Sequence, residues 1–111
     1  MSKPTINLDQ FQQFDLKIGT VKAAKRLENS NKLLILTVDF GSEERTILAG
    51  IGKVTADVET LVGTQMPFIV NLEPKELAGE MSHGMVLAAS GPEGPVLLRP
   101  STPVEPGTEI R

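Results

Sequence analysis

The sequence contains no cysteine, no tryptophan and no tyrosine, and it has a single histidine, His83. The lack of cysteine excludes disulfides and thiolate metal sites. One imidazole cannot supply the cluster of histidines that many zinc sites need. Ser82 precedes His83 directly, and neighbouring side chains on a strand point to opposite faces, so the two make a poor nucleophile–base pair. We therefore expect no catalytic residue, no metal site and no cofactor.

The aromatic residues are four phenylalanines, and their apolar surroundings predict that all of them are core residues: Phe11, Phe14, Phe40 and Phe68. Proteins that bind single-stranded nucleic acid stack bases on exposed aromatic side chains. The expected burial of these rings disfavours that class. If the chain binds RNA, we expect it to contact the backbone and the folded shape through Lys, Arg, Asn and Ser.

The length of 111 residues predicts one domain, residues 1–111. No apolar run reaches membrane-spanning length and residues 1–7 lack a signal-peptide pattern, which predicts a cytoplasmic protein. The net charge of −3 hides an asymmetry, because residues 1–53 carry eight basic and six acidic groups whereas residues 54–111 carry three and eight. The densest basic cluster consists of Lys22, Lys25, Arg26 and Lys32. A local positive patch is therefore possible, with moderate and salt-sensitive RNA binding.

Periodicity and turn residues predict mostly short strands. Asn7 and Gln10 have the spacing of a capping box at the start of a short helix. A second short helix is expected over Thr55–Leu61, before the stop signal Gly63. Gly19 indicates a bulge or a close approach inside the first strand. The expected strands are Leu16–Ala23, Leu33–Phe40, Arg45–Ala49, Gln65–Leu72, Gly84–Ser90, Val96–Arg99 and Thr108–Ile110.

This order of elements predicts an all-β fold. Five or six short strands with a helix between the third and fourth suit a small barrel, which closes its own edges. A five-stranded OB-fold is the preferred architecture, and a β-sandwich, which usually has more strands, is the alternative.

Several polar segments have more than one interpretation. Lys32 lies between a polar loop and an apolar strand, where a ligand contact and a solvated lysine are equally plausible. Arg45 could contact RNA or pair with Asp39 across a hairpin. Asn71 is expected to cap a turn, and Met85 to be a core residue more often than a contact. The segment 50–53 (GIGK) lacks the further Gly and the Ser or Thr of a phosphate-binding loop, so we interpret it as a turn.

Ordered sequence blocks give the chain a resemblance to a known family. The most specific blocks are Asn71-Leu72-Glu73-Pro74-Lys75 and Ser82-His83-Gly84-Met85, and the others include Phe14-Asp15-Leu16-Lys17-Ile18, Ser30-Asn31-Lys32-Leu33-Leu34, Arg45-Thr46-Ile47-Leu48-Ala49-Gly50-Ile51 and Pro106-Gly107. Together they resemble the tRNA-binding domain found at the C-terminus of many methionyl-tRNA synthetases and in small free-standing proteins.

The resemblance implies an OB-fold barrel over about residues 14–90 and a C-terminal extension, about 91–111, that takes part in a homodimer. It also implies binding to folded tRNA with little sequence preference, as a free-standing protein or together with the catalytic chain of a synthetase. The implied tRNA-binding residues are Ser30, Asn31, Lys32, Arg45, Asn71, Lys75, Ser82, His83 and Met85. His83 stands where the family often has Glu or Gln, so contacts there could depend on pH.

Two other functions remain open. A CsaA-like chaperone shares the fold and would bind unfolded or exported polypeptide. A structural domain would instead dock a synthetase to its partners. Relatives of the chaperone type generally lack the Ala-Gly-Ile and Gly-Met-x-Leu-Ala-Ala blocks found at residues 49–51 and 84–89, which favours the tRNA-binding reading.

Overall fold

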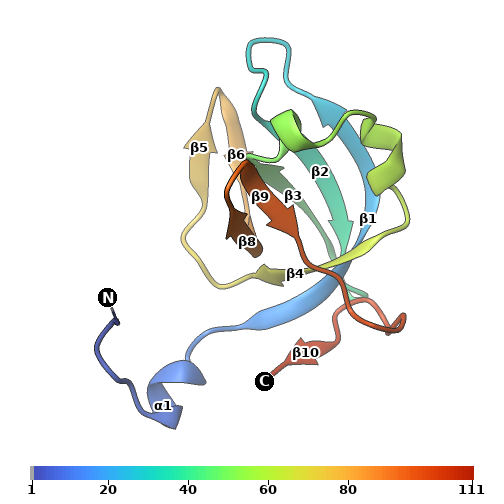
Figure 1. Cartoon of the computed structure of the whole chain (residues 1–111). Coiled ribbons are helices and arrows are strands. Elements are labelled where there is room, and N and C mark those ends of the chain that lie inside the picture. The colour runs from blue at the N-terminus through green and yellow to red at the C-terminus, as the bar shows by residue number, and fades with distance from the viewer. Residues whose placement is uncertain (1) are drawn as a thin grey trace.

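The computed structural model describes residues 2–111, and its strands form a small barrel (Figure 1). The elements in chain order are α1 (Leu8–Phe11), β1 (Leu16–Arg26), β2 (Leu34–Asp39), β3 (Glu44–Ala49), the 3₁₀ helices η1 (Gly52–Val54) and η2 (Val58–Leu61), β4 (Gln65–Ile69), β5 (Lys75–Leu77), β6 (Glu80–Ser82), β7 (Met85–Val86), β8 (Ala88–Gly91), β9 (Gly94–Leu97) and β10 (Glu109–Ile110). In residues 2–111 no helix is both long and apolar enough to cross a membrane.

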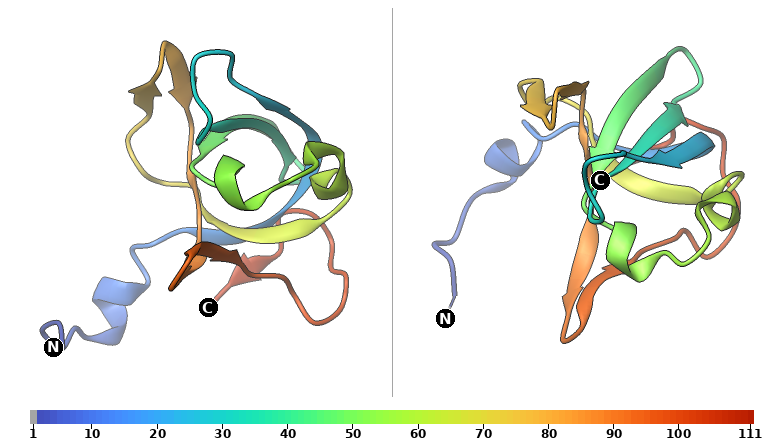
Figure 2. Two further views of the ribbon diagram at one scale, coloured as in Figure 1. Left: turned by 45° about the horizontal axis from the view of Figure 1, so that its top comes forward. Right: turned by 90° about the horizontal axis from the view of Figure 1, so that it is seen from above.

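The barrel follows the strand order β3-β2-β1-β4-β7, with every neighbouring pair antiparallel. The long strand β1 pairs with β4 through its first half and with β2 through its second half, so it curves across the barrel (Figure 2). Its register shifts between Val21 and Ala23, which is a β-bulge that adds to the bend. The nearly closed five-stranded barrel confirms the predicted OB-fold class.

Alternation along the strands builds the core. On β2 the residues Leu34, Leu36 and Val38 point inward and are fully buried, as the period of two requires. The rings of Phe40 and Phe68 meet edge to face with centroids 5.5 Å apart. Gly19 confirms the predicted close approach, because a Cβ there would lie 2.4 Å from Val38 Cγ1.

The N-terminal arm, residues 2–15, differs from its prediction. The capping box between Asn7 and Gln10 is present, but α1 extends away from the barrel and buries no residue (Figure 1). Phe14 is therefore 51% exposed instead of buried, and Phe11 is only partly buried. The prediction of four core phenylalanines was wrong for this pair, since periodicity within a segment does not reveal whether the segment packs against its own chain.

The prediction of an α-helix over Thr55–Leu61 was wrong, because that range holds only the 3₁₀ turn η2, and η1 ends just before it. Thr55 donates from its hydroxyl to the Ile51 carbonyl, and Asp57 accepts from the amide of Glu59. These local bonds offer the backbone an alternative to an α-helix.

Two short hairpins, β5–β6 and β8–β9, form separate two-stranded sheets beside the barrel. The β8–β9 hairpin lies where two strands were expected, with the second strand beginning at Gly94 instead of Val96. The β5–β6 hairpin was not predicted. Its two-residue turn places Ala78 and Gly79 at φ 51° and 86°, and alanine is an unusual residue for that left-handed conformation.

The C-terminal extension returns to the barrel. The Gln65 side chain donates to the Val104 carbonyl at 2.6 Å and accepts from the Val104 amide at 3.0 Å, as a neighbouring strand would. Glu109 and Ile110 then pair with β1, which confirms the short final strand.

Candidate nucleic-acid interface

The β1–β2 loop, residues 27–33, is shaped by one serine. The Ser30 hydroxyl oxygen accepts from the amides of Lys32 and Leu33 at 3.2 and 3.1 Å, and the Leu27 amide donates to the Leu33 carbonyl. These bonds close the loop and leave Asn31 and Lys32 exposed at its end. Ser30 therefore orders the loop, while the two residues after it are presented to solvent.

The basic cluster seen in the sequence divides into structural and exposed members. Arg26 donates to the carbonyls of Gly52, at 2.9 Å, and of Thr55, so its guanidinium holds η1 in place. Lys22, Lys25 and Lys32 are exposed and take part in no salt bridge within residues 2–111. Their charges are therefore available to an anionic partner.

The β5–β6 hairpin lies beside this loop, and the two enclose a hollow. The hollow has a volume of about 380 Å³ and is lined by Lys25, Arg26, Leu27, Glu28, Asn29, Ile35, Ala78 and Glu80. A second, shallower hollow follows the loop itself along residues 26–32. The structure places Ser30, Asn31 and Lys32 on this loop, beside Lys25 of the basic cluster seen in the sequence. The sequence analysis did not single out Asn29 or the hairpin tip.

A smaller apolar pocket lies on the other side of the hairpin. It has a volume of about 200 Å³, and its lining residues are Leu48, Leu72, Glu73, Lys75, Leu77, Ser82, Gly84 and Met85. Met85 is 48% exposed, so it offers contact area and is not a core residue. Lys75 is exposed and takes part in no salt bridge among the described residues.

Ser82 has an internal role. Its side chain is buried, its oxygen accepts from the Leu48 amide at 2.9 Å and its hydroxyl donates to the Gly84 carbonyl at 3.0 Å. The first bond joins β6 to β3, and the second holds the turn that follows β6. The hydroxyl is therefore committed within the protein, and it makes no pair with His83.

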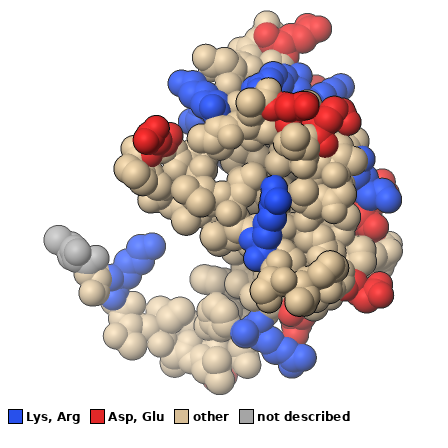
Figure 3. All heavy atoms as spheres, turned by 45° about the vertical axis from the view of Figure 1, so that its right-hand side comes forward, with Lys and Arg blue, Asp and Glu red and all other residues tan. Residues whose placement is uncertain are grey.

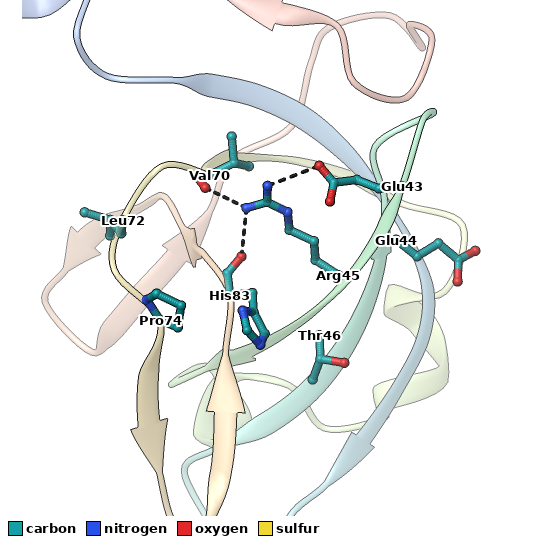
Figure 4. A pocket seen from close by; sticks show the side chains of 8 residues that line it. All are labelled: Glu43, Glu44, Arg45, Thr46, Val70, Leu72, Pro74 and His83. Carbon is teal, nitrogen blue, oxygen red and sulfur yellow. Dashed lines mark hydrogen bonds and ion pairs between the residues drawn. The ribbon is translucent and has the colours of Figure 1, made fainter.

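Arg45 also joins β3 to the segment after β6, and we call this junction the seam of the barrel. Its side chain lies in a third pocket (Figure 4). Its guanidinium donates to the carbonyls of Val70, at 2.6 Å, and of His83, at 3.3 Å, and to the Glu43 carboxylate at 3.1 Å. Of the two alternatives for Arg45, the pairing with Asp39 was wrong, because Asp39 accepts from the Gly41 amide and lies opposite Glu44 in the hairpin.

The Arg45 guanidinium also changes the ionisation of Glu43. Its hydrogen bond and its charge lower the pKa of the Glu43 carboxyl below the usual value. A carboxyl with a lower pKa in the folded state stabilises the fold above its unfolded pKa, and loses that contribution as the pH falls through its folded pKa. Glu43 is exposed to solvent, so the contribution is small.

Asn71 connects the barrel to the N-terminal arm. Its side-chain oxygen Oδ1 accepts from the Asp15 amide at 2.8 Å, and its side-chain nitrogen Nδ2 donates to the Gln13 carbonyl at 2.7 Å. The side chain therefore bonds across the fold instead of capping its own turn. His83, in contrast, is exposed.

The surface carries charges of both signs. Figure 3 shows lysine and arginine side chains interspersed with acidic ones over one face, with no broad field of a single sign. Within residues 2–111 no group of acidic and histidine side chains could hold a metal ion. The lysines around the loop and the hairpin can neutralise a few phosphates, and the nearby polar groups can bond to a sugar–phosphate backbone.

Comparison with known proteins decides the family. The family profile described as "Putative tRNA binding domain" matches residues 16–109. The chain belongs to this family. It is 48% identical over 109 residues to the methionine–tRNA ligase of Methanothrix thermoacetophila, covering 98% of this chain and 16% of the ligase. This tRNA-binding domain thus spans about a sixth of that relative's length.

Two solved structures share the domain's fold along its whole length. A MetRS-related protein from Pyrococcus horikoshii is 36% identical, with a TM-score of 0.91 and coverage of 98% of this chain and all of that one. The chaperone CsaA from Bacillus anthracis is 33% identical, with a TM-score of 0.87 and coverage of 97% and 100%. The family resemblance seen in the sequence is therefore confirmed.

Proposed function

We propose that this domain binds folded tRNA by its shape and backbone, through the β1–β2 loop and the β5–β6 hairpin. The observation that carries the proposal is a set of exposed lysines around the hollows of a tRNA-binding family member, which take part in no salt bridge within residues 2–111: Lys25, Lys32 and Lys75. Lys32 and Lys75 neutralise phosphates. Asn31 and His83 bond to phosphate or 2′-hydroxyl oxygens, and Met85 gives an adaptable apolar contact.

The remaining predicted site residues support the interface from within. Ser30 orders the loop, Asn71 tethers the arm, and Arg45 and Ser82 close the barrel. The mixture of lysines with Glu28, Glu73 and Glu80 keeps the net attraction modest. Binding is therefore moderate in affinity, sensitive to salt and selective for folded shape over sequence.

Lys32→Ala is expected to weaken binding to all tRNAs by a similar factor. Lys32 contacts phosphate and no base, so its loss removes about one released counterion from the salt dependence. The measurement is a fluorescence anisotropy titration of two different tRNAs at several salt concentrations. Lys3→Ala, which removes the same charge from the N-terminal arm, is the matched control. An unchanged affinity and slope in Lys32→Ala would remove Lys32 from the interface.

A symmetric homodimer is part of the proposal. The N-terminal arm exposes Ile6, Leu8 and Phe14, although the cap of α1 is fully formed. Figure 3 shows an open gap between the arm and the barrel, and residues 2–111 leave these three side chains about half or more exposed. A second copy, meeting the arm and the exposed Val96 and Leu98 of the C-terminal extension, covers these side chains.

Phe14→Ser is expected to shift the protein from dimer to monomer. Phe14 lies outside the core, and Asn71 bonds to the backbone on either side of it, so the barrel keeps its fold. Sedimentation velocity at micromolar concentration measures the shift, with Val62→Ser, another exposed apolar residue, as the control. The interface would have to lie elsewhere if Phe14→Ser sedimented as the wild type does.

The proposal places the domain in the cytoplasm, beside a synthetase catalytic chain or acting alone. Its similarity to CsaA supports a second candidate, a chaperone that holds apolar segments of unfolded polypeptide in the pocket beside Lys75. A third candidate is a structural domain that docks a synthetase to partners. An aggregation assay with an unfolded client tests the chaperone, and co-purification with the synthetase chain tests the docking domain.

A further inference from the structure

The segment Gly50-Ile51-Gly52, which follows β3, lies against the β1–β2 loop. Ile51 is buried and anchors the segment in the core. A Cβ built on Gly50 would lie 3.3 Å from Lys32 Cε and 3.9 Å from Lys32 Cγ, with no other neighbour within 4 Å. The aliphatic stem of Lys32 therefore rests on the bare Cα of Gly50.

Gly52 holds the backbone of the same lysine. Its amide donates to the Lys32 carbonyl at 2.7 Å, and its carbonyl accepts from Arg26 at 2.9 Å. A Cβ on Gly52 would lie 2.8 Å from the Lys32 carbonyl oxygen and 3.0 Å from that of Asn31. Gly52 therefore fixes the main chain of Lys32, whereas Gly50 contacts only its side chain.

Glycine at position 50 is not needed for the backbone. Gly50 is not among the residues with φ in the left-handed region, so an L-residue fits its conformation. Gly50 is also exposed, which leaves room for a side chain apart from the Lys32 stem. A side chain at position 50 would therefore displace the side chain of Lys32.

We propose that Gly50 is a positioning residue for Lys32, whose bare Cα lets the lysine stem lie flat and present its ammonium to a phosphate of the bound RNA. The proposal rests on the proposed function. A long lysine side chain loses much rotamer freedom when it binds. A stem already lying on a fixed surface has less to lose, so the contact is stronger for the same charge.

A double-mutant cycle with Gly50→Val and Lys32→Ala tests the inference. Gly50→Val lifts the stem and is expected to reproduce most of the loss caused by Lys32→Ala, about fivefold in affinity for folded tRNA at low salt. It should cause no further loss when Lys32 is already alanine. The midpoint of urea unfolding of the single variant Gly50→Val should match that of the wild type. A general effect of the valine on the fold would weaken binding equally in both backgrounds, and that result overturns the proposal.

A measurement without RNA separates this inference from the proposed function. NMR relaxation of the Lys32 Cε group reports its picosecond-to-nanosecond mobility. We expect Lys32 to be more ordered than the exposed Lys22, and to lose that order in Gly50→Val. Equal mobility of Lys32 in both proteins contradicts the positioning role, even if tRNA binds. A third outcome is also informative: Lys32 is ordered, but Lys32→Ala binds tRNA as tightly as the wild type does. That result overturns the role of Lys32 and Gly50 in binding, while the tRNA-binding function stands.

Discussion

Gly107→Ala is expected to be among the most destabilising single substitutions in this protein, with a loss of about 4 kcal/mol in the free energy of unfolding. Gly107 has φ 88°, and a Cβ there would lie 2.1 Å from the Phe40 carbonyl oxygen. Neither atom can move cheaply, because the Gly107 amide donates to the Ile18 carbonyl at 2.7 Å and Phe40 is part of the core. The substitution therefore forces the C-terminal return away from β1.

Gly63→Ala is the matched control for this prediction. Gly63 has the same φ of 88°, but a Cβ there would meet nothing within 4 Å. Gly63→Ala therefore lowers the free energy of unfolding only by the cost of the left-handed conformation, about 1–2 kcal/mol. Urea unfolding of both variants separates the steric clash from the backbone strain. Equal losses in the two variants would show that the contact with Phe40 does not hold the extension in place.

Ser82→Ala is expected to open the seam of the barrel between β3 and the β6–β7 segment. The Ser82 oxygen is the acceptor for the buried Leu48 amide, and the His83 amide donates to the Thr46 carbonyl across the same seam at 2.9 Å. Alanine leaves the Leu48 amide without a partner, which costs about 1–3 kcal/mol. It also frees the Gly84 carbonyl, which accepts from the Ser82 hydroxyl.

Amide hydrogen exchange measures this opening where it occurs. The Leu48 and His83 amides should exchange much faster in Ser82→Ala, while amides of the β1–β2 pairing change only with global stability. Ser90→Ala is the control, since Ser90 is exposed and its hydroxyl makes no hydrogen bond in the described part of the chain. Protection of Leu48 at the wild-type level would mean that the seam does not depend on Ser82.

The barrel could be predicted from the sequence where side-chain alternation was strong. Strand β2 was found because LLILTVDF is an apolar run between turn residues, and Gly19 was found because a lone glycine in a strand indicates close approach. The β5–β6 hairpin escaped because its strands are short and charged, and because Ala78 occupies a turn position where asparagine or glycine is the usual signal.

The candidate site could be predicted from the sequence only in part. The limit here differs from the one that hid the β5–β6 hairpin. Family blocks pointed to Asn71, Ser82 and Arg45, but a sequence pattern does not say whether a polar side chain bonds inward or outward. All three bond within the protein, to the arm, to β3 and across the seam. The exposed arm with Phe14 could not be foreseen either, because the sequence shows that its residues are apolar but not that residues 2–111 leave them exposed.

The most direct test of the central claim is a titration of the wild-type protein with three nucleic acids. They are folded tRNA, an unfolded RNA of the same composition and single-stranded DNA, each at two salt concentrations. We predict a preference for folded tRNA that weakens as salt rises, because a few lysines contact the phosphates of a folded backbone. Equal weak binding to all three, or none, would contradict the account and favour the chaperone or the docking domain.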